Sequence, residues 1–421
     1  MSSICIFEDE NFSGLLPLVW FRPVFDLRCG MSTLYEKIKR YYPRTNIYLL
    51  CRDYLAALAK KTHPGTVVGK IGKESSVLFI NGRLLCDKET PRSIPLAGGD
   101  EIFEADGKII AARLSKGNLE MIANSISAPI TEKSFSAVRS TARSSHASVK
   151  LIDQFFDIIA NNREQLALDI NFTTRGGITR GRVHSSIALY SRGGIFIDDG
   201  AEIEAFATLD ARPGPIFISR GVKVLPYSRI EGPAFIGERS VISTGSNLRS
   251  GVSMGPDCRV GGEVEDTIFQ ARSNKSHDGF LGNSYIAEWV NLGAGTTNSN
   301  LKNNYGNVKV TYKTTETDSG QIFLGCAVGD HTKCGIGTLI NTGSIIGASS
   351  NIYGGGILPK FVPSFAWGQP GDLVKHDPEH AIKTAKAVMA RRDVEMEESD
   401  IDLFRKVFEL TEDERSSCGV S

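Results

Sequence analysis

Large apolar residues recur every six positions through the middle of the chain. From residue 218 the phase holds without a slip through Ile218, Val224, Ile230, Ile236, Ile242, Leu248, Met254 and Val260. Four positions after each of them stands a small or β-branched residue, which gives a second column of Val222, Ser228, Ala234, Ser240, Ser246, Val252, Cys258 and Val264. Two columns that keep one phase indicate an internal repeat rather than chance.

The same spacing returns on both sides of this run. Its further members are Ile197, Ile203, Ile286, Leu292, Ile322, Val328, Cys334, Ile340, Ile346 and Ile352. A period of six fits neither a helix nor the simple alternation of a strand. It predicts a left-handed parallel β-helix, in which each hexad makes one short strand and one corner, and three hexads close a coil. A β-sandwich is the alternative, but it would not keep a six-residue phase.

Most of the 43 glycines lie between residues 166 and 360, which supports the prediction because tight corners favour glycine. Two stretches interrupt the phase, Asp266–Gly279 and Lys302–Gln321, and we expect both to leave the coils as loops. Insertions in such repeats often lie on the binding face. The first carries Lys275 and His277, so we expect a site for a phosphorylated ligand there, with Lys275 binding substrate. Two solvated loops are the alternative.

The first third of the chain has a different pattern. Short apolar runs at residues 3–8 and 76–80 are separated by helical patterns at 32–42 and 53–61. This alternation predicts an α/β domain with a parallel, Rossmann-like sheet. A further helical pattern at 149–166 leads from this domain towards the repeats.

After the repeats, a Pro- and Gly-rich stretch at 361–371 precedes two helical patterns. The first runs from Pro378 to Arg392, and Ser399 is the expected N-cap of the second. We therefore predict three parts, namely an α/β domain at 1–165, a β-helix at 166–360, and a capping segment with a helical tail at 361–421.

Charge and composition argue against two kinds of partner. The 48 Lys and Arg residues balance 48 Asp and Glu residues, so no net charge attracts a nucleic acid or an anionic membrane. The eight cysteines contain no Cys-x-x-Cys pair, and no long apolar stretch could cross a membrane. We expect a cytoplasmic protein that binds neither nucleic acid nor membrane.

A family resemblance is carried by Ser273–Val310, which reads SNKSHDGFLGNSYIAEWVNLGAGTTNSNLKNNYGNVKV. This segment resembles the GlmU-like family of bifunctional N-acetylglucosamine-1-phosphate uridyltransferases and glucosamine-1-phosphate acetyltransferases. The resemblance implies that His277 takes a proton from a sugar amine while acetyl-CoA is attacked. It also implies that Asn291 contacts the sugar and that Arg249 holds the sugar phosphate. Ala294 and Asn300 are the implied contacts of acetyl-CoA.

The segment Leu15–Ile38 resembles the opening of sugar-phosphate nucleotidyltransferases, and the resemblance implies that Arg22 and Arg28 meet phosphates. Where that family has a Gly-rich phosphate loop, this chain reads EDENFSG, and Asn81 stands where the family has a magnesium-binding aspartate. Two interpretations follow. The domain is a divergent uridylyltransferase, or it binds a sugar nucleotide without turning it over.

Metal chemistry in the coils has little support. Carbonic anhydrases with hexapeptide repeats bind zinc through three histidines, and the main coil region offers only His277 and His331. His331 follows Val328 by three residues, so we expect it to face outward and to serve a surface role. We predict no metal ligands among these residues.

The sequence and the resemblance together predict a sugar-phosphate acyltransferase that moves an acetyl group from acetyl-CoA to an amino-sugar 1-phosphate. The protein is bifunctional if its first domain also transfers a nucleotidyl group from an NTP, with Mg²⁺, to a sugar 1-phosphate. The resemblance further implies a homotrimer. The alternative is a non-catalytic trimer that binds sugar nucleotides or acts as a scaffold, which is favoured by Asn81 and by Phe280 in place of a family tyrosine.

Overall fold

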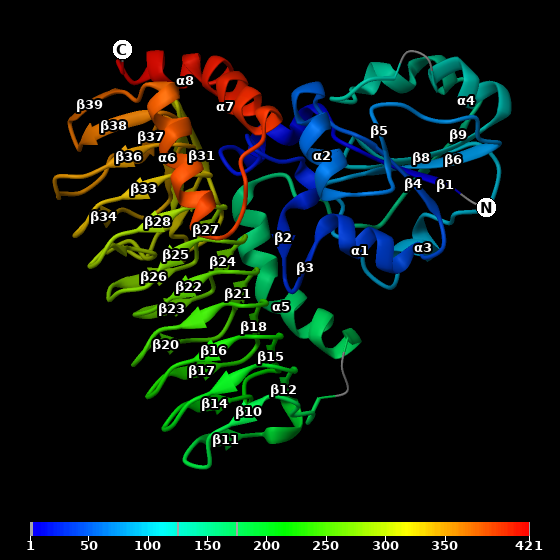
Figure 1. Ribbon diagram of the computed structural model, residues 1–421. Coiled ribbons are helices and arrows are strands. Elements are labelled where there is room, and N and C mark those ends of the chain that lie inside the picture. Colours follow the sequence, from blue (N-terminus) through cyan, green and yellow to red (C-terminus); the bar gives the residue numbers. More distant parts are fainter. Residues whose placement is uncertain (1–2, 124–125, 174–175, 421) are drawn as a thin grey trace. The chain divides into compact units, whose positions relative to one another are not determined.

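The computed structural model describes residues 3–123, 126–173 and 176–420 (Figure 1). The chain forms two compact units. The first comprises Met1–Leu27 and Ser32–Gln154, and the second comprises Arg28–Met31 and Phe155–Ser421. The division between the units falls before Phe155, whereas the sequence places a domain boundary after residue 165.

The first unit is an α/β domain built on a seven-stranded sheet. In spatial order its strands are β5 (Val67–Val68), β4 (Asn46–Leu50), β1 (Ser3–Phe7), β6 (Ser76–Asn81), β8 (Lys108–Ser115), β7 (Glu101–Ala105) and β9 (Arg143–His146). The pairs β1–β4, β1–β6 and β4–β5 are parallel, whereas β8 is antiparallel to both β6 and β7. The predicted parallel core is therefore confirmed, with an antiparallel extension that the sequence pattern did not indicate.

Helices cross between the strands of this unit. They are α1 (Leu34–Tyr41), α2 (Ala56–Thr62), α3 (Thr90–Ser93) and α4 (Lys116–Ala123), and β3 (Ser32–Thr33) leads into α1. Thr33 begins α1 with a capping box, in which its hydroxyl accepts from the Glu36 amide and the Glu36 carboxylate accepts from the Thr33 amide. The helical patterns at 32–42 and 53–61 thus correspond to α1 and α2.

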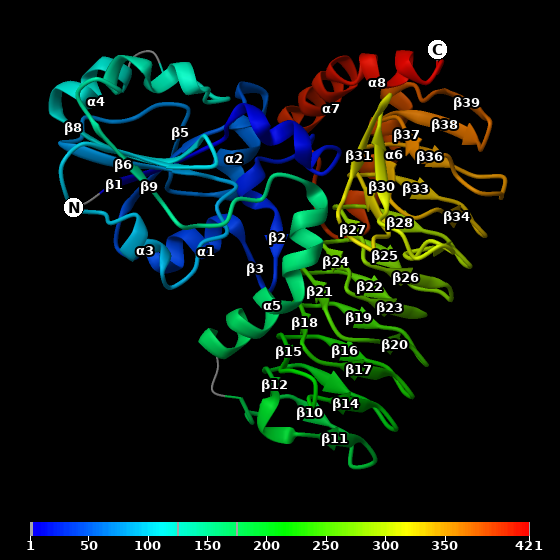
Figure 2. The same cartoon turned by 180° about the vertical axis from the view of Figure 1, so that it is seen from behind.

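The second unit contains a parallel β-helix made of three stacks of strands (Figure 2). The 11-stranded sheet consists of β10 (Arg182–Val183), β13 (Glu202–Ile203), β16 (Lys223–Val224), β19 (Val241–Ile242), β22 (Arg259–Val260), β25 (Asn274–Lys275), β28 (Asn291–Leu292), β33 (Lys333–Cys334), β36 (Asn351–Ile352), β38 (Ala366–Gln369) and β39 (Asp372–Lys375). All of its pairs are parallel except β38–β39, the last.

The other two stacks complete each coil. The nine-stranded sheet consists of β12 (Ile195–Ile197), β15 (Ile216–Ile218), β18 (Ala234–Ile236), β21 (Val252–Met254), β24 (Ile268–Phe269), β27 (Tyr285–Ile286), β32 (Cys326–Val328), β35 (Ser344–Ile346) and β37 (Phe361–Val362). The six-stranded sheet consists of β11 (Ala188–Tyr190), β14 (Thr208–Asp210), β17 (Arg229–Glu231), β20 (Asn247–Leu248), β23 (Glu263–Glu265) and β26 (Phe280–Gly282), and the pair β29 (Thr297–Asn298) with β34 (Leu339–Ile340) follows it.

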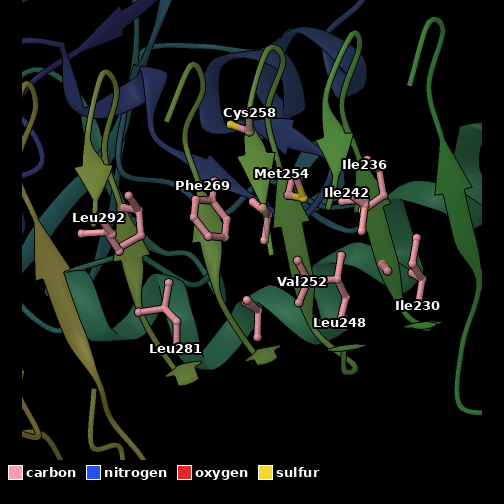
Figure 3. Packing of buried hydrophobic residues seen from close by; sticks show 14 of the residues in the cluster. Ile230, Ile236, Ile242, Leu248, Val252, Met254, Cys258, Phe269, Leu281 and Leu292 are labelled. Carbon is pink, nitrogen blue, oxygen red and sulfur yellow. The ribbon is translucent and has the colours of Figure 1, made fainter. Parts of the chain in front are cut away.

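The six-residue phase corresponds directly to the core. All eight large residues from Ile218 to Val260 are fully buried in one hydrophobic cluster. Figure 3 shows five of them inside the coils, namely Ile230, Ile236, Ile242, Leu248 and Met254. Every third hexad stacks, so that Ile218 pairs with Ile236 and Ile236 with Met254. Burying each such side chain contributes about 1.5–3 kcal/mol. The predicted β-helix is therefore confirmed, and this column is its main stabilising feature.

The first interruption of the phase does not leave the coils, and that prediction is wrong. Asp266–Gly279 contains β24 and β25, which continue two of the sheets. The corner before it is shortened, because Val264 follows Val260 after only four residues and pairs with Leu248. The chain therefore stays in register while the six-residue count slips.

The second interruption does leave the coils, as predicted. It forms an antiparallel hairpin of β30 (Lys309–Tyr312) and β31 (Thr315–Asp318). The expected repeat position Ile322 is wrong, because this side chain is 46% exposed at the end of the insertion. The regular column resumes only at Val328, which pairs with Ile286.

The α-helices among the described residues of the second unit are α5 (Phe155–Thr173), α6 (Pro378–Ala390), α7 (Glu398–Leu410) and α8 (Glu412–Ser417). Asp377 caps α6 by accepting from the amides of Glu379 and His380. The N-cap of α7 is Glu397 rather than the expected Ser399, because Glu397 and Asp400 form a reciprocal capping box. Within the described residues no helix is long and apolar enough to span a bilayer.

Candidate functional site

His277 lies at the corner between β25 and β26, and its side chain is exposed. Across the described residues its imidazole makes no hydrogen bond or ion pair. The next coil places Ala294 at the equivalent corner, and the Gly295 amide donates to the Asp278 carbonyl at 3.1 Å. His277 and Ala294 therefore lie on adjacent corners of one edge of the β-helix.

Lys275 does not present its ammonium to solvent, which corrects the expectation that it binds substrate. It pairs with Val260 in the inward-facing column and is only 1% exposed. Its Nζ donates to the carbonyls of His277 at 2.7 Å, Asp278 at 3.3 Å and Gly261 at 3.5 Å. Burial lowers the pKa of Lys275 to about 8. Lys275 therefore ties the backbone of the His277 corner to the coil below it.

A glycine makes room for this ammonium. Gly262 has φ +75°, and a β-carbon there would lie 2.7 Å from the Gly279 carbonyl oxygen and 3.1 Å from Lys275 Nζ. A larger residue would therefore be strained and would press on both the corner and the ammonium. Residue 262 is therefore a glycine because the Lys275 ammonium and the backbone of the His277 corner leave no room for a side chain.

Asn291 lies on the outer face of the 11-stranded sheet and is exposed. It pairs with Asn274 of the coil below, and the Asn274 Nδ2 donates to the Asn291 Oδ1 at 3.5 Å. The Arg392 Nη2 donates to the Asn274 Oδ1 at 2.9 Å. The structure thus joins the predicted sugar contact to an arginine just beyond α6. Sequence reasoning missed Arg392, because the end of a helix carries no signal of the coil it reaches.

Arg249 and Asn300 lie on the other side of this edge, on the face of the six-stranded sheet. Arg249 forms ion pairs with Glu263 at 3.5 Å and Glu265 at 2.6 Å, and its side chain is 48% exposed. The Asn300 Nδ2 donates to the Glu265 Oε1 at 3.3 Å and to the Asn283 Oδ1 at 2.7 Å. The predicted phosphate contact and cofactor contact are therefore bridged by one glutamate.

His331 faces outward from its coil, as expected, but it is half-buried under the helical tail, which corrects the expected surface role. Its ring stacks on Trp289 at 6.2 Å and meets Phe404 edge-on at 4.7 Å. The reason is that α7 supplies Phe404 over this corner, which the six-residue phase alone does not reveal. His331 therefore packs beneath the helical tail and does not share the His277 corner.

The carboxyl edge of the parallel strands in the first unit carries two buried ion pairs. Glu8 follows β1, and its carboxylate accepts from the Arg52 Nε at 3.1 Å and Nη2 at 3.0 Å, and from the Arg52 and Val24 amides at 2.8 Å. Arg52 follows β4 and is 5% exposed. Both charges therefore lie inside the domain, neutralised by each other.

Asp9 and Arg83 form the second pair. The Arg83 Nε donates to the Asp9 Oδ1 at 2.8 Å, and the Asn81 Nδ2 donates to the Asp9 Oδ2 at 2.9 Å. Arg83 is fully buried and also pairs with Asp153, which in turn accepts from Lys108 at 2.6 Å. Asn81 thus belongs to a closed network in which each acid has a cationic partner.

Magnesium does not fit this edge. Its preferred ligands are carboxylate and water oxygens, and both acids here are bonded to arginines. Among residues 3–123, 126–173 and 176–420, no group of three His, Cys, Asp or Glu side chains is placed to hold a metal ion. Glu8 and Asp9, which stand at the start of the stretch where that family has its phosphate loop, therefore form salt bridges with Arg52 and Arg83.

The two arginines predicted to meet phosphates belong to different units. Arg22 is buried in the first unit, where its Nη1 donates to the Leu18 carbonyl at 2.9 Å. Arg28 belongs to the second unit, where its amide donates to the Gln270 Oε1 at 3.1 Å and the Tyr285 hydroxyl at 2.9 Å. Its guanidinium lies 5.7 Å from the centre of the Phe235 ring. Both arginines thus have structural partners inside the protein.

Comparisons with known proteins find matches over parts of the chain. Residues 4–178 match the family model described as sugar nucleotidyl transferase. A bifunctional sugar-1-phosphate nucleotidylyltransferase/acetyltransferase from Sulfurisphaera tokodaii is 38% identical over 100 residues, which cover 24% of this chain and 25% of that protein. The bifunctional protein GlmU from Herminiimonas arsenicoxydans is 30% identical over 190 residues, which cover 44% of this chain and 38% of that protein.

The matched stretches span less than half the length of these relatives. Among solved structures, a UDP-N-acetylglucosamine acyltransferase from Campylobacter jejuni covers 53% of this chain and 95% of its own, at 15% identity. Its TM-score of 0.32 is too low to support a conclusion. Residues 4–178 thus resemble a sugar nucleotidyl transferase, and part of the chain is similar to proteins named bifunctional nucleotidylyltransferase/acetyltransferase and GlmU.

Proposed function

We propose that the β-helix is a sugar-phosphate acyltransferase that transfers an acetyl group from acetyl-CoA to the amine of an amino-sugar 1-phosphate. The observation that carries this proposal is the exposed imidazole of His277, which no described residue engages, on the same edge as Asn291 and Ala294. The names of the two sequence relatives, which include acetyltransferase and GlmU, favour the same reaction.

The reaction needs a base at this corner. The amine nitrogen attacks the thioester carbonyl, a carbon–nitrogen bond forms, and the carbon–sulfur bond breaks to release coenzyme A. An imidazole accepts a proton near neutral pH, so His277 is suited to remove the proton that the amine loses. That proton is then available to the departing thiolate, and no redox partner or metal is required for the balance.

Lys275 supports this role from inside the coil. Its ammonium binds the carbonyls of His277 and Asp278 together, so the corner has little freedom to move. Positioning of this kind matters because a displacement of about 1 Å at a catalytic group costs about 100-fold in rate. Lys275 is a positioning residue for His277 in this proposal, and Ala294 and Asn300 are proposed contacts of acetyl-CoA.

The experiment is an acetyl-transfer assay of the full chain with acetyl-CoA and glucosamine 1-phosphate, in which the acetylated sugar is measured by mass spectrometry. The His277→Ala variant is expected to lose about 100- to 10,000-fold in rate with unchanged thermal stability. His184→Ala is the matched control, since His184 is an exposed histidine of the same β-helix whose Nδ1 accepts only a local amide. Unchanged activity of His277→Ala would refute the proposal.

A second candidate function belongs to the first unit, and the family-model match at residues 4–178 favours it. We propose that this unit binds a sugar nucleotide, with nucleotidyl transfer from an NTP as the reaction to be tested. The measurement is pyrophosphate release with a sugar 1-phosphate and each NTP in the presence of Mg²⁺. Release would establish transfer, whereas binding without release would establish a module that holds its ligand without turnover.

The assembly and the location of the protein are proposals of the same kind. We propose a cytoplasmic homotrimer, from the resemblance to the GlmU-like family and from the charge balance and cysteine pattern of the chain. Sedimentation of the full chain tests the trimer. A monomer that retains full acetyl transfer would contradict the proposed homotrimer.

A further inference from the structure

A strip of polar and cationic residues runs along the outer face of the 11-stranded sheet, next to the His277 corner. Backbone register places Arg259 beside Asn274, Asn274 beside Asn291, and Asn291 beside Lys333. Neighbouring strands lie about 4.8 Å apart, so the four positions span roughly 14 Å. Their side chains leave the sheet on the same side, because alternate residues of a strand face opposite ways. We call these four residues and Arg392 the cationic strip.

Helix α6 determines where this strip is accessible. Ala381, Thr384 and Ala385 of α6 line a small pocket together with Lys333 and Asn351, so the helix covers the upper part of the sheet. Arg392 lies just after α6, and its Nη2 donates to the Asn274 Oδ1 at 2.9 Å. Asn291 and Arg259 remain exposed. The accessible part of the strip therefore lies just beyond the C-terminal end of α6.

The charges of the strip are not neutralised locally. Within the parts of the chain that the structure describes, neither Arg259 nor Arg392 has a carboxylate partner. The Lys333 ammonium donates to the carbonyls of His331, at 3.0 Å, and Trp289. By contrast, Arg249 across the edge faces both Glu263 and Glu265. A phosphate therefore meets uncompensated cations on the strip and two carboxylates around Arg249.

We propose that the cationic strip binds the phosphate group of a substrate of the His277 corner, in the place that the family resemblance assigns to Arg249. Arg259 and Arg392 would donate paired hydrogen bonds to the phosphate oxygens, as a planar guanidinium does. Asn274 and Asn291 would hold the neutral part of the ligand. This inference rests on the proposed acyl transfer, since it assigns a ligand to the same site.

The distances allow one ligand to reach both groups. His277 follows Asn274 by three residues, so their α-carbons lie at most about 10 Å apart. The phosphate has two possible sources, the amino-sugar 1-phosphate and coenzyme A. Both carry the phosphate oxygens that the arginines recognise, and the experiment must therefore use each ligand separately.

Isothermal titration of the full chain tests the proposal with two probes, glucosamine 1-phosphate and coenzyme A. Arg392→Gln and Arg259→Gln are each expected to raise the dissociation constant of one of these ligands by about 10- to 100-fold, because each loses a charged hydrogen bond. Arg182→Gln is the matched control, since Arg182 lies on the same sheet but pairs with Glu202. Thermal melting of each variant excludes loss of folding.

Each outcome has a defined meaning. If the arginine variants bind glucosamine 1-phosphate more weakly, the strip holds the sugar phosphate. If they bind coenzyme A more weakly, the strip holds the acyl donor. The proposal is overturned if both ligands bind Arg392→Gln and Arg259→Gln as they bind the native protein, or if binding depends on Arg249→Gln instead. Loss of acetyl transfer in His277→Ala together with normal binding to the arginine variants would leave acyl transfer standing and the strip refuted. If the arginine variants bind their ligand more weakly but the native protein transfers no acetyl group, the strip stands as a binding site and the proposed acyl transfer is refuted.

Discussion

Arginines serve opposite purposes in the two regions where the sequence predicts phosphate binding. At the carboxyl edge of the first unit, Arg52 and Arg83 are buried and bonded to Glu8 and Asp9. On the outer face of the β-helix, Arg259 is exposed and Arg392 donates to the Asn274 amide oxygen. A cation that already has a buried carboxylate partner is not available to a ligand, which is why the phosphate site that we propose lies in the second region.

The two regions differ because a buried charge and an exposed charge lose different amounts of hydration free energy. A charge inside a domain loses several kcal/mol of hydration, which only a close partner of opposite sign offsets. A charge on an outer strand face keeps its water until a ligand displaces it. Residue type alone therefore does not identify a phosphate site, and the neighbours that the fold supplies decide the outcome.

The largest change in stability is expected on replacing Arg83. Replacing it with Met leaves Asp9 buried without its cation, so Arg83→Met is expected to lower the unfolding free energy by about 3–5 kcal/mol. Urea unfolding followed by circular dichroism measures the change. Arg92→Met is the control, because Arg92 forms an exposed pair with Glu89. A loss below about 1 kcal/mol, the range of surface pairs, would show that the edge is not a closed network.

The next effect concerns the lysine inside the β-helix. The pKa of Lys275 is about 8 in the folded protein, and an unfolded lysine has a pKa near 10.4. Between these values the unfolded chain binds more protons, so stability rises with pH and gains about 3 kcal/mol in total from this group. Below about pH 8 both states are protonated and the slope vanishes.

Comparing the native protein with Lys275→Met isolates this contribution, because other titrating groups cancel in the difference. The stability of the native protein relative to the variant is expected to increase from pH 7.5 to pH 10, as measured by urea unfolding. A difference that is flat with pH would mean that Lys275 has an ordinary pKa and does not lie in the core column.

The smallest effect is expected at Arg249, the exposed counterpart of the buried pairs. Its side chain is 48% exposed, so solvent screens its bonds to Glu263 and Glu265. Arg249→Ala is expected to change the unfolding free energy by less than about 1 kcal/mol. A loss as large as that of Arg83→Met would show that the two regions do not differ as described.

Periodicity was the part of the sequence that predicted structure best. The six-residue phase identified the coils because a repeated inward position must be filled by an apolar residue in every hexad, and Ile218 to Val260 do so. The phase failed at Asp266–Gly279, where a shortened corner changes the count while the strands remain paired. Counting residues cannot distinguish a shortened corner from a loop, since both break the period.

The candidate site was predicted only in part. The corner of His277, Ala294 and Asn291 is local in sequence, so one segment was enough to bring these residues together. Arg392 was missed because it reaches the site from more than a hundred positions away, through the packing of a helix. Lys275 was misjudged because only strand register reveals that it faces inward.

Hydrogen exchange of the full chain, read by mass spectrometry with and without glucosamine 1-phosphate and coenzyme A together, compares the two regions in one measurement. We predict slower exchange in peptides that cover residues 257–262, 272–296 and 388–396 on ligand binding, and no change at residues 5–15, 50–54 and 79–85. Protection confined to the segments around Glu8, Arg52 and Arg83, with none around His277 and Arg392, would contradict the account.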